Sequence, residues 1–126
     1  LFHGIRVKPG MPTMLSVVED IPVLSLSGNP FAVAALFELL AGGYLADRAE
    51  EVYIQKKETK VLRQTFVKTG KPKRIVNGKC DEEGVFLPQI QRNGQLKNGI
   101  GSNCLVVFPE GERTYPEGEK VQVIRI

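Results

Sequence analysis

Two short stretches near the start of the sequence carry residues suited to binding an anion. The first is Ser27-Gly28-Asn29-Pro30, where an apolar run stops and a helical pattern begins at once. A helix N-terminus presents unpaired backbone N–H groups and a partial positive charge of about half a unit, so phosphate and other oxyanions bind at such turns. Gly28 would let the backbone approach an anion closely. The alternative is a capped joint that holds no ligand.

The second stretch is a stiff loop upstream of that turn. Lys8, Pro9 and Gly10, followed by Met11 and Pro12, precede the apolar run. Proline and glycine in such a cluster predict a turn-rich loop. Lys8 could then neutralise an anion held at the downstream turn, and the alternative is a surface lysine in a tight turn.

The sequence gives little support for any other catalytic site or for a metal site. The sequence contains no nucleophile elbow, H-E-x-x-H motif, Walker A loop or strand-following G-x-G-x-x-G. A usual Cys/His zinc site needs four ligands, and the sequence has two Cys and one His. We therefore expect no metal site in this chain. We expect Cys80 and Cys104 to be free thiols, with Cys104 buried, although a disulfide between them is the alternative.

Charge is distributed unevenly along the chain. Residues 1–48 carry a net charge of −1 and residues 49–126 a net charge of +4, which places a boundary near residue 48. The second part contains a loose basic cluster that is either a solvated hairpin or a groove for a polyanion. It lacks interleaved aromatic residues and a known nucleic-acid module, so we expect no nucleic-acid partner. The cluster consists of Lys68, Lys71, Lys73, Arg74 and Lys79.

The elements that must position the first two stretches are a strand and a helix. The apolar run 21–26 predicts a buried strand. Asn29 can cap the following helix, with Pro30 at its first position, and Gly42 and Gly43 should end or kink it. One strand and one helix cannot form a sheet covered by helices, so residues 1–48 are predicted to be the end of an α/β domain. The first residue is Leu and not Met, which agrees with this expectation.

The predicted helix has one apolar face. Phe31, Ala34, Ala35, Phe37 and Leu40 can share it. Exposed apolar patches of that size are rare, so we expect this face to pack against the β part or another copy of the chain.

Residues 49–126 are predicted to be all-β. Strands are expected at 51–57 and 60–68 with the segment 57–59 between them, a hairpin turn at Asn77-Gly78, a buried strand within 103–111 and a closing strand at 119–126. Close spacing of short strands suggests a small barrel or sandwich. The predicted fold is therefore mixed, a partial α/β strand–turn–helix segment followed by a small all-β, barrel-like domain.

Composition fits an ordinary globular protein. The chain has 126 residues, of which 42% are hydrophobic and 25% charged. No apolar stretch approaches the roughly 18 residues of a membrane span, and the first residues do not form a signal peptide. We therefore expect a cytoplasmic protein with no membrane partner.

Taken together, these residues resemble the MoeA/gephyrin family of molybdopterin molybdenumtransferases. F-H-G-I-R-V-K-P-G-M-P and then I-P-V-L-S-L-S-G-N-P-F-A-V-A-A-L-F-E-L-L are similar to the end of the family's molybdopterin-binding domain, where K-P-G-K-P precedes L-P-G-N-P-V-S-A. Residues 91–111 and 116–126 are similar to the family's small C-terminal β domain. The resemblance covers essentially all 126 residues.

The resemblance implies an activity. Family members insert molybdate into adenylylated molybdopterin and release AMP, with magnesium, as cytosolic homodimers. The family's acidic metal-binding residues are not in this sequence, so the chain by itself is expected to be inactive. The alternative is a scaffold or partner-binding module, because gephyrin-like members bind a partner's peptide with the same half of the protein. The substrate-binding residues implied are Lys8, Pro9, Gly10, Ser27, Gly28, Asn29, Pro30, Lys68 and Asn93.

Five positions differ from the family's pattern. Met11 stands for the second lysine of the loop, Ser27 for a proline, Ala32 for a serine, Lys68 for an arginine and Asn93 for a serine. Lysine keeps the charge of arginine but loses its planar fork. These changes lead to two hypotheses, altered handling of the oxyanion or reduced activity.

Overall fold

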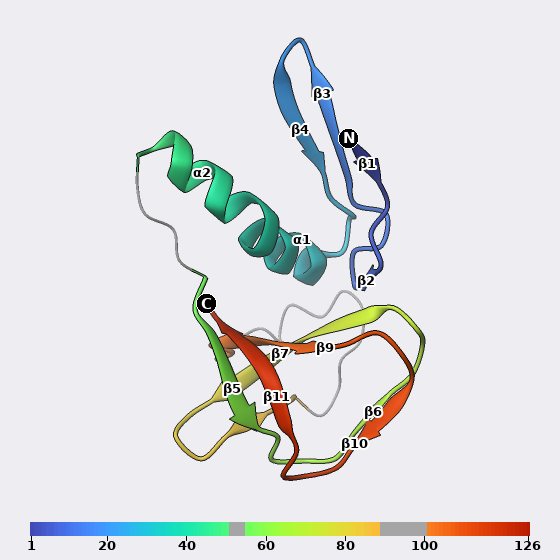
Figure 1. Ribbon diagram of the computed structural model, residues 1–126, viewed down its shortest axis with the longest axis vertical. Helices are drawn as coiled ribbons and strands as arrows, with labels where there is room; N and C mark the ends of the chain where they lie inside the picture. The colour runs from blue at the N-terminus through green and yellow to red at the C-terminus, as the bar shows by residue number, and fades with distance from the viewer. Residues whose placement is uncertain (51–54, 89–100) are drawn as a thin grey trace.

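The computed structural model describes residues 1–50, 55–88 and 101–126 (Figure 1). A small sheet and a helix occupy one half of the molecule, and a larger β structure occupies the other (Figure 1). The mixed fold class predicted from the sequence is confirmed, because the described residues form mostly strands together with one helical region.

The first half contains a three-stranded antiparallel sheet. Strands β1 (Phe2–His3), β3 (Met14–Val18) and β4 (Ile21–Ser25) pair in the order β1-β3-β4. A tight turn at Glu19 and Asp20, both at positive φ, joins β3 to β4 and makes them a hairpin. The strand predicted at 21–26 is present as β4, but its predicted burial is wrong, because the first three residues of β4 are exposed. An apolar run signals burial only when another layer covers it.

The helical region runs without a break from Pro30 to Arg48. It consists of α1 (Pro30–Leu36), a π-helical turn η1 (Phe37–Ala41) and α2 (Gly42–Arg48). Gly42 and Gly43 do not end the helix; the irregular turn precedes them. By length and composition alone, these 19 residues could cross a membrane, and 17% of the tested window is buried. That is weak evidence, since other kinds of helix pass the same test.

The second half is built around a six-stranded sheet. Strands β2 (Val7–Lys8), β7 (Lys73–Cys80), β9 (Cys104–Phe108), β11 (Lys120–Arg125) and β5 (Lys57–Val61) follow one another, and β8 (Val85–Phe86) pairs with β7. Strands β6 (Phe66–Lys68) and β10 (Arg113–Tyr115) form a separate pair. An isolated bridge joins Leu62 to Val85, but the described strands form no closed sheet. The expected barrel is therefore not confirmed.

The hairpin predicted at Asn77-Gly78 is wrong. Both residues lie inside β7, where Asn77 pairs with Leu105 and Gly78 with Cys104. An ideal Cβ on Gly78 would lie 2.9 Å from Val106 Cγ2 and 3.0 Å from Val85 Cγ2. Glycine is therefore needed there for close packing, and the turn comes later, where Asp81 N bonds to Gly84 O.

The boundary predicted between two strands at 57–59 is also wrong. Residues 57–59 lie within β5, paired with β11, and the chain leaves the sheet only at Leu62 before β6 begins. Residues 51–54 of the first expected strand are outside the described residues. The strand expected at 103–111 is confirmed as β9 and the closing strand as β11.

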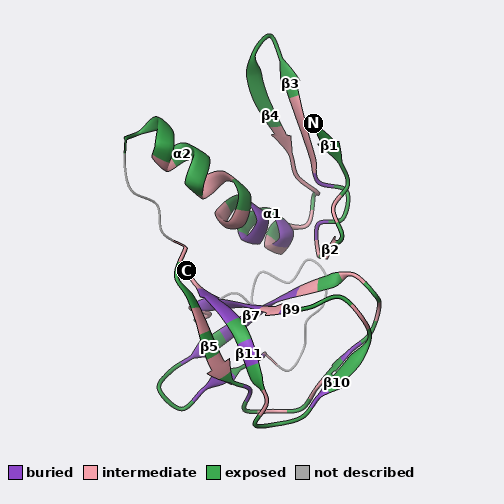
Figure 2. Ribbon diagram, viewed as in Figure 1, coloured by how far each residue is buried: buried purple, intermediate pink, exposed green. Residues whose placement is uncertain are grey.

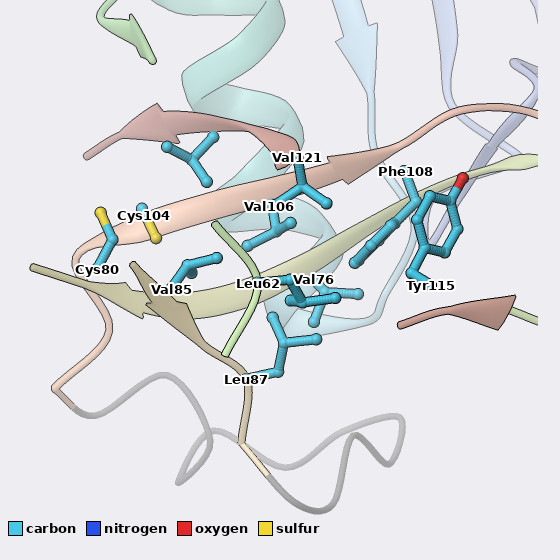
Figure 3. Packing of buried hydrophobic residues seen from close by; sticks show 11 residues of the cluster. Leu62, Val76, Cys80, Val85, Leu87, Cys104, Val106, Phe108, Tyr115 and Val121 are labelled. Atoms are coloured by element: carbon cyan, nitrogen blue, oxygen red, sulfur yellow. The ribbon is translucent and has the colours of Figure 1, made fainter. Parts of the chain in front are cut away.

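Two hydrophobic clusters hold the fold together (Figure 2). One lies inside the β half, where the centroid of the Phe108 ring lies 4.4 Å from that of Phe66 and 4.8 Å from that of Tyr115. Figure 3 shows Phe108 and Tyr115 side by side in this cluster. The other joins the halves, because Leu36 of α1 packs with residues of the large sheet. Its buried members are Ala35, Leu36, Ile75, Leu105 and Ile124.

The apolar helix face predicted from the sequence is divided in the structure. Ala32, Ala35 and Leu36 are buried, whereas Phe37 and Leu40 remain almost half exposed. The irregular turn at η1 separates the packed first part of the helix from the exposed remainder (Figure 2).

Candidate functional site

The Lys8–Gly10 loop begins on the edge of the large sheet. Val7 and Lys8 pair in parallel with Lys73 and Arg74 of β7. The Lys8–Pro9 peptide bond is cis, and Gly10 follows with φ +110°, which glycine adopts without strain. Thr13 N then donates to Gly10 O at 3.0 Å and closes the turn. The loop is therefore anchored at both ends.

Gly10 brings this loop against the helix. An ideal Cβ on Gly10 would lie only 2.1 Å from Leu36 Cδ1. Leu36 belongs to α1, which starts at Pro30 directly after the second predicted stretch. The Lys8–Gly10 loop and the Ser27–Pro30 turn are therefore both attached to α1, the loop at the residue where the helix ends and the turn where it begins.

The backbone donors at the start of the helix are already used. Asn29 Oδ1 accepts hydrogen bonds from Phe31 N at 3.0 Å and Ala32 N at 3.2 Å, and Asn29 O accepts from Val33 N at 3.0 Å. The predicted cap at Asn29 and the predicted place of Pro30 are confirmed. The expectation of unpaired N–H groups in the first helical turn is wrong for these residues, because the cap satisfies them.

Gly28 lies in an open part of the turn. No heavy atom that could crowd an added Cβ lies within 4 Å, and Gly28 does not have the positive φ that favours glycine. The described chain therefore gives neither a packing nor a conformational reason for glycine at this position. Close approach of a ligand to the backbone would be such a reason.

Two hydroxyl groups near these stretches lack partners among the described residues. Ser27 Oγ and Thr13 Oγ1 are both buried, with no hydrogen bond to them in the described part of the chain. Thr13 Oγ1 lies 3.6 Å from the ideal Cβ position of Gly10. Thr13 was not predicted as a site residue from the sequence. The local signal that could have indicated it is its position directly after the proline-rich loop.

The two remaining predicted residues are not brought into this site. Lys68 is 2% exposed and lies on β6, where its Nζ donates to Gly70 O at 2.7 Å and Gly111 O at 2.6 Å. Its charge is thus satisfied by two backbone carbonyls. Asn93 is outside the described residues. Among the other altered positions, Met11 is 47% exposed and Ala32 is fully buried.

Both cysteines are free thiols and Cys104 is buried, as predicted, and Cys80 is buried as well. Their side chains lie beside each other at one end of the β core (Figure 3). Burial, together with a hydrogen bond to Cys80, raises the pKa of the Cys104 thiol to about 12. Because the thiolate is the nucleophile, Cys104 stays protonated and unreactive at neutral pH.

A magnesium site does not fit the described residues. Among residues 1–50, 55–88 and 101–126, no group of three or more His, Cys, Asp or Glu side chains could hold a metal ion. Magnesium prefers carboxylate and other oxygen ligands.

The described chain thus has a lysine-containing loop and a helix cap attached to opposite ends of α1, which packs against the large sheet. Comparison with known proteins places it in a family. Residues 63–126 match the family model of the MoeA C-terminal region (domain IV), and the chain belongs to that family.

Relatives and solved structures resemble the whole chain. It is 31% identical over 98% of its length to a Methanocaldococcus jannaschii protein assigned to molybdopterin biosynthesis, and 27% identical over its full length to the molybdopterin molybdenumtransferase of Bacillus subtilis. The crystal structure of the moeA molybdopterin biosynthesis protein from Pyrococcus horikoshii matches all of the chain with a TM-score of 0.81 and 25% identity. The chain spans 29% and 30% of these two relatives and 32% of that structure.

Proposed function

We propose that this chain contributes to molybdenum cofactor biosynthesis as part of a molybdopterin molybdenumtransferase. The reaction is insertion of molybdate into adenylylated molybdopterin with release of AMP. The names of the relatives support the proposal. Because the chain spans less than a third of those relatives, we propose a contribution to the substrate site and no molybdate insertion by these 126 residues alone.

The observation that carries this proposal is the junction at Gly10. The Lys8–Gly10 loop contacts Leu36, and the helix that contains Leu36 starts at the Ser27–Pro30 turn. Two stretches that are separate in the sequence are therefore held by one structural unit. The open Gly28 lies in the second of them.

Each residue of the site has a distinct part in the proposed binding. Lys8 supplies positive charge for molybdate or a substrate phosphate, and Gly28 lets the anion approach the backbone. Asn29 acts as a positioning residue, because its side chain is occupied by the helix cap. The buried hydroxyls of Ser27 and Thr13 are donors available beside the anion.

Further properties are proposed on the family resemblance. They are a cytoplasmic location, assembly as a homodimer, a barrel-like arrangement of the β part, and a magnesium requirement met by residues outside this chain. Lys68 and Asn93 are proposed as substrate contacts on the same basis. The division into 1–48, the end of a molybdopterin-binding domain, and 49–126, a C-terminal β domain, is proposed likewise.

Calorimetric titration tests the proposed site. The chain is titrated with adenylylated molybdopterin and, separately, with molybdate. We expect Lys8→Ala to weaken binding about tenfold, as the loss of one charge-assisted contact does. Gly28→Ala should also weaken binding while leaving stability unchanged, because the added methyl meets no described atom.

Lys79→Ala is the matched control, since Lys79 is an exposed lysine on β7. It should bind both ligands like the unaltered chain. No measurable affinity of the unaltered chain for either ligand, or equal weakening by all three substitutions, would contradict the proposal.

A further inference from the structure

We propose that a pocket on the large sheet, with a lysine on each side, binds a phosphate group. The pocket has a volume of about 200 Å³ and lies where β7, β9 and β11 run side by side (Figure 1). The proposal does not rest on the proposed substrate site, because no residue of that site lines the pocket. The lining residues are Lys73, Val107, Pro109, Lys120, Val121 and Gln122.

The strand register brings the two lysines of the pocket to opposite sides of Pro109. The β7–β9 and β9–β11 pairings place Lys73 and Lys120 level with Pro109, one on each neighbouring strand. Neighbouring strands lie about 4.8 Å apart, so the two lysine Cα atoms are about 10 Å apart. Their flexible four-carbon side chains can therefore bring both ammonium groups to one anion above Pro109.

The pocket lies beyond the part of the sheet that the helix covers. Ile75, two residues after Lys73 on β7, is buried in one cluster with Leu36 of α1. Side chains alternate along a strand, so Lys73 points to the same face as Ile75. Lys73, Lys120 and Gln122 are nevertheless exposed. A ligand can therefore reach the pocket from solvent.

Neither lysine of the pocket has an anionic partner in the described part of the chain. No ion pair or side-chain hydrogen bond of Lys73 or Lys120 occurs among the described residues. Glu119, which precedes Lys120, pairs with Arg113 instead, and Glu110, which follows Pro109, does not line the pocket. Two like charges beside one pocket repel each other, and a bound dianion removes that repulsion.

The size and the remaining lining of the pocket favour a small oxyanion. A volume of about 200 Å³ is below the roughly 300–1,000 Å³ of pockets that hold drug-sized ligands. The Gln122 side chain can donate a hydrogen bond to an anionic oxygen beside the two ammonium groups. Lysine binds phosphate as a point charge. The ligand is therefore a free phosphate ion or the phosphate group of a small ester.

The pocket is separate from the Lys8–Gly10 loop, although both adjoin β7. Lys8 pairs with Arg74, the residue after Lys73, and alternation along the strand directs these two side chains to the opposite face of the sheet. Of the basic cluster predicted from the sequence, Lys73 lines the pocket, and its counterpart Lys120 comes from β11. Substitutions in the pocket should therefore leave the proposed substrate site intact.

Nuclear magnetic resonance titration of the isotope-labelled chain tests the proposal, with inorganic phosphate as the probe at constant ionic strength. We expect saturable shifts of backbone amides at Lys73, Lys120 and Gln122, with a dissociation constant of about 1–10 mM. Lys73→Gln and Lys120→Gln each remove one charge and should raise that constant about fivefold. Lys79→Gln is the matched control, because Lys79 is an exposed lysine of β7 outside the pocket. It should bind phosphate like the unaltered chain.

The same spectra report folding, since a folded variant keeps its amide signals away from the pocket. No saturable shift, or equal weakening by Lys79→Gln, would overturn the proposal. So would shifts confined to the Lys8–Gly10 loop and lost in Lys8→Ala, because phosphate would then occupy the proposed substrate site. We expect Lys8→Ala to keep phosphate binding, so the two proposals fail separately.

Glycerol 3-phosphate distinguishes the two sources of the phosphate group. The same shifts at similar affinity would assign an ester as a ligand, with its organic part outside the pocket. Much weaker binding than that of inorganic phosphate would restrict the pocket to the free ion. Either result supports a phosphate site between Lys73 and Lys120, provided that their substitution weakens binding of the ligand.

Discussion

At the scale of single residues, Lys68 shows how burial changes the role expected of a charged side chain. Its ammonium donates to Gly70 O and Gly111 O, which joins the loop after β6 to the loop before β10. Removing a buried donor leaves carbonyls without partners and costs the desolvation penalty of those groups. The Lys68 ammonium therefore stabilises the fold, whether or not it also contacts a ligand.

We predict that Lys68→Met lowers the free energy of unfolding by about 2 kcal/mol. Lys71→Met changes an exposed lysine nearby and should alter stability by no more than about 0.5 kcal/mol. Urea unfolding followed by circular dichroism measures both. Equal stability of the two variants would show that the carbonyl contacts of Lys68 contribute nothing to the fold.

Cys104 makes stability depend on pH at the alkaline end. Its thiol pKa is raised to about 12 in the folded chain, from an ordinary value of 9.0. The unfolded chain therefore releases this proton first, and the free energy of unfolding falls as pH rises from about 9 toward 12. Below that range the thiol adds no pH dependence.

Cys104→Ala should remove this contribution. Its urea midpoint is expected to fall less between pH 7 and pH 10.5 than that of the unaltered chain, because lysine and tyrosine titration is common to both proteins. The same pH dependence in both would show that burial does not hold the proton on Cys104.

At the scale of elements, Gly78 decides how closely β7, β8 and β9 pack. A methyl group there would meet Val106, Val85 and Cys104 at 2.9 to 3.1 Å. Overpacking of this kind costs about 1–3 kcal/mol. We predict that Gly78→Ala is destabilised by that amount in urea unfolding, and that Gly28→Ala, whose methyl meets open space, is not. Equal stability of both variants would mean that the side chains around residue 78 rearrange to accommodate the added methyl group without cost.

A feature could be predicted from the sequence where the residues that determine it are neighbours in the chain. The Asn29 cap was predictable because cap, proline and helix are consecutive residues. The hairpin prediction at Asn77-Gly78 was wrong because pairing and packing with β9, which is distant in the sequence, overrode the local turn signal. The orphan hydroxyl of Thr13 and the carbonyl contacts of Lys68 follow from the folded arrangement, so residue types alone did not indicate them.

At the scale of the whole molecule, the helix and the large sheet share one core. Leu36, 2% exposed, packs with Ile75, Leu105 and Ile124, and the β2–β7 pairing joins the same two halves along the backbone. Elements that share a buried cluster lose contacts together when either opens. The proposed division near residue 48 is thus one of sequence segments, across which we expect a single cooperative unfolding unit.

We therefore predict that Leu36→Ala destabilises both halves, by about 2–5 kcal/mol, as large-to-small substitutions in a core do. Native-state hydrogen exchange should show faster exchange in α1 and also in β7 and β9, since their protection depends on the same cluster. Val33→Ala alters a 38% exposed residue of the same helix and should change exchange little. Faster exchange confined to the helix would show that the two halves are stable independently, and that the cluster around Leu36 does not couple the helix to the large sheet.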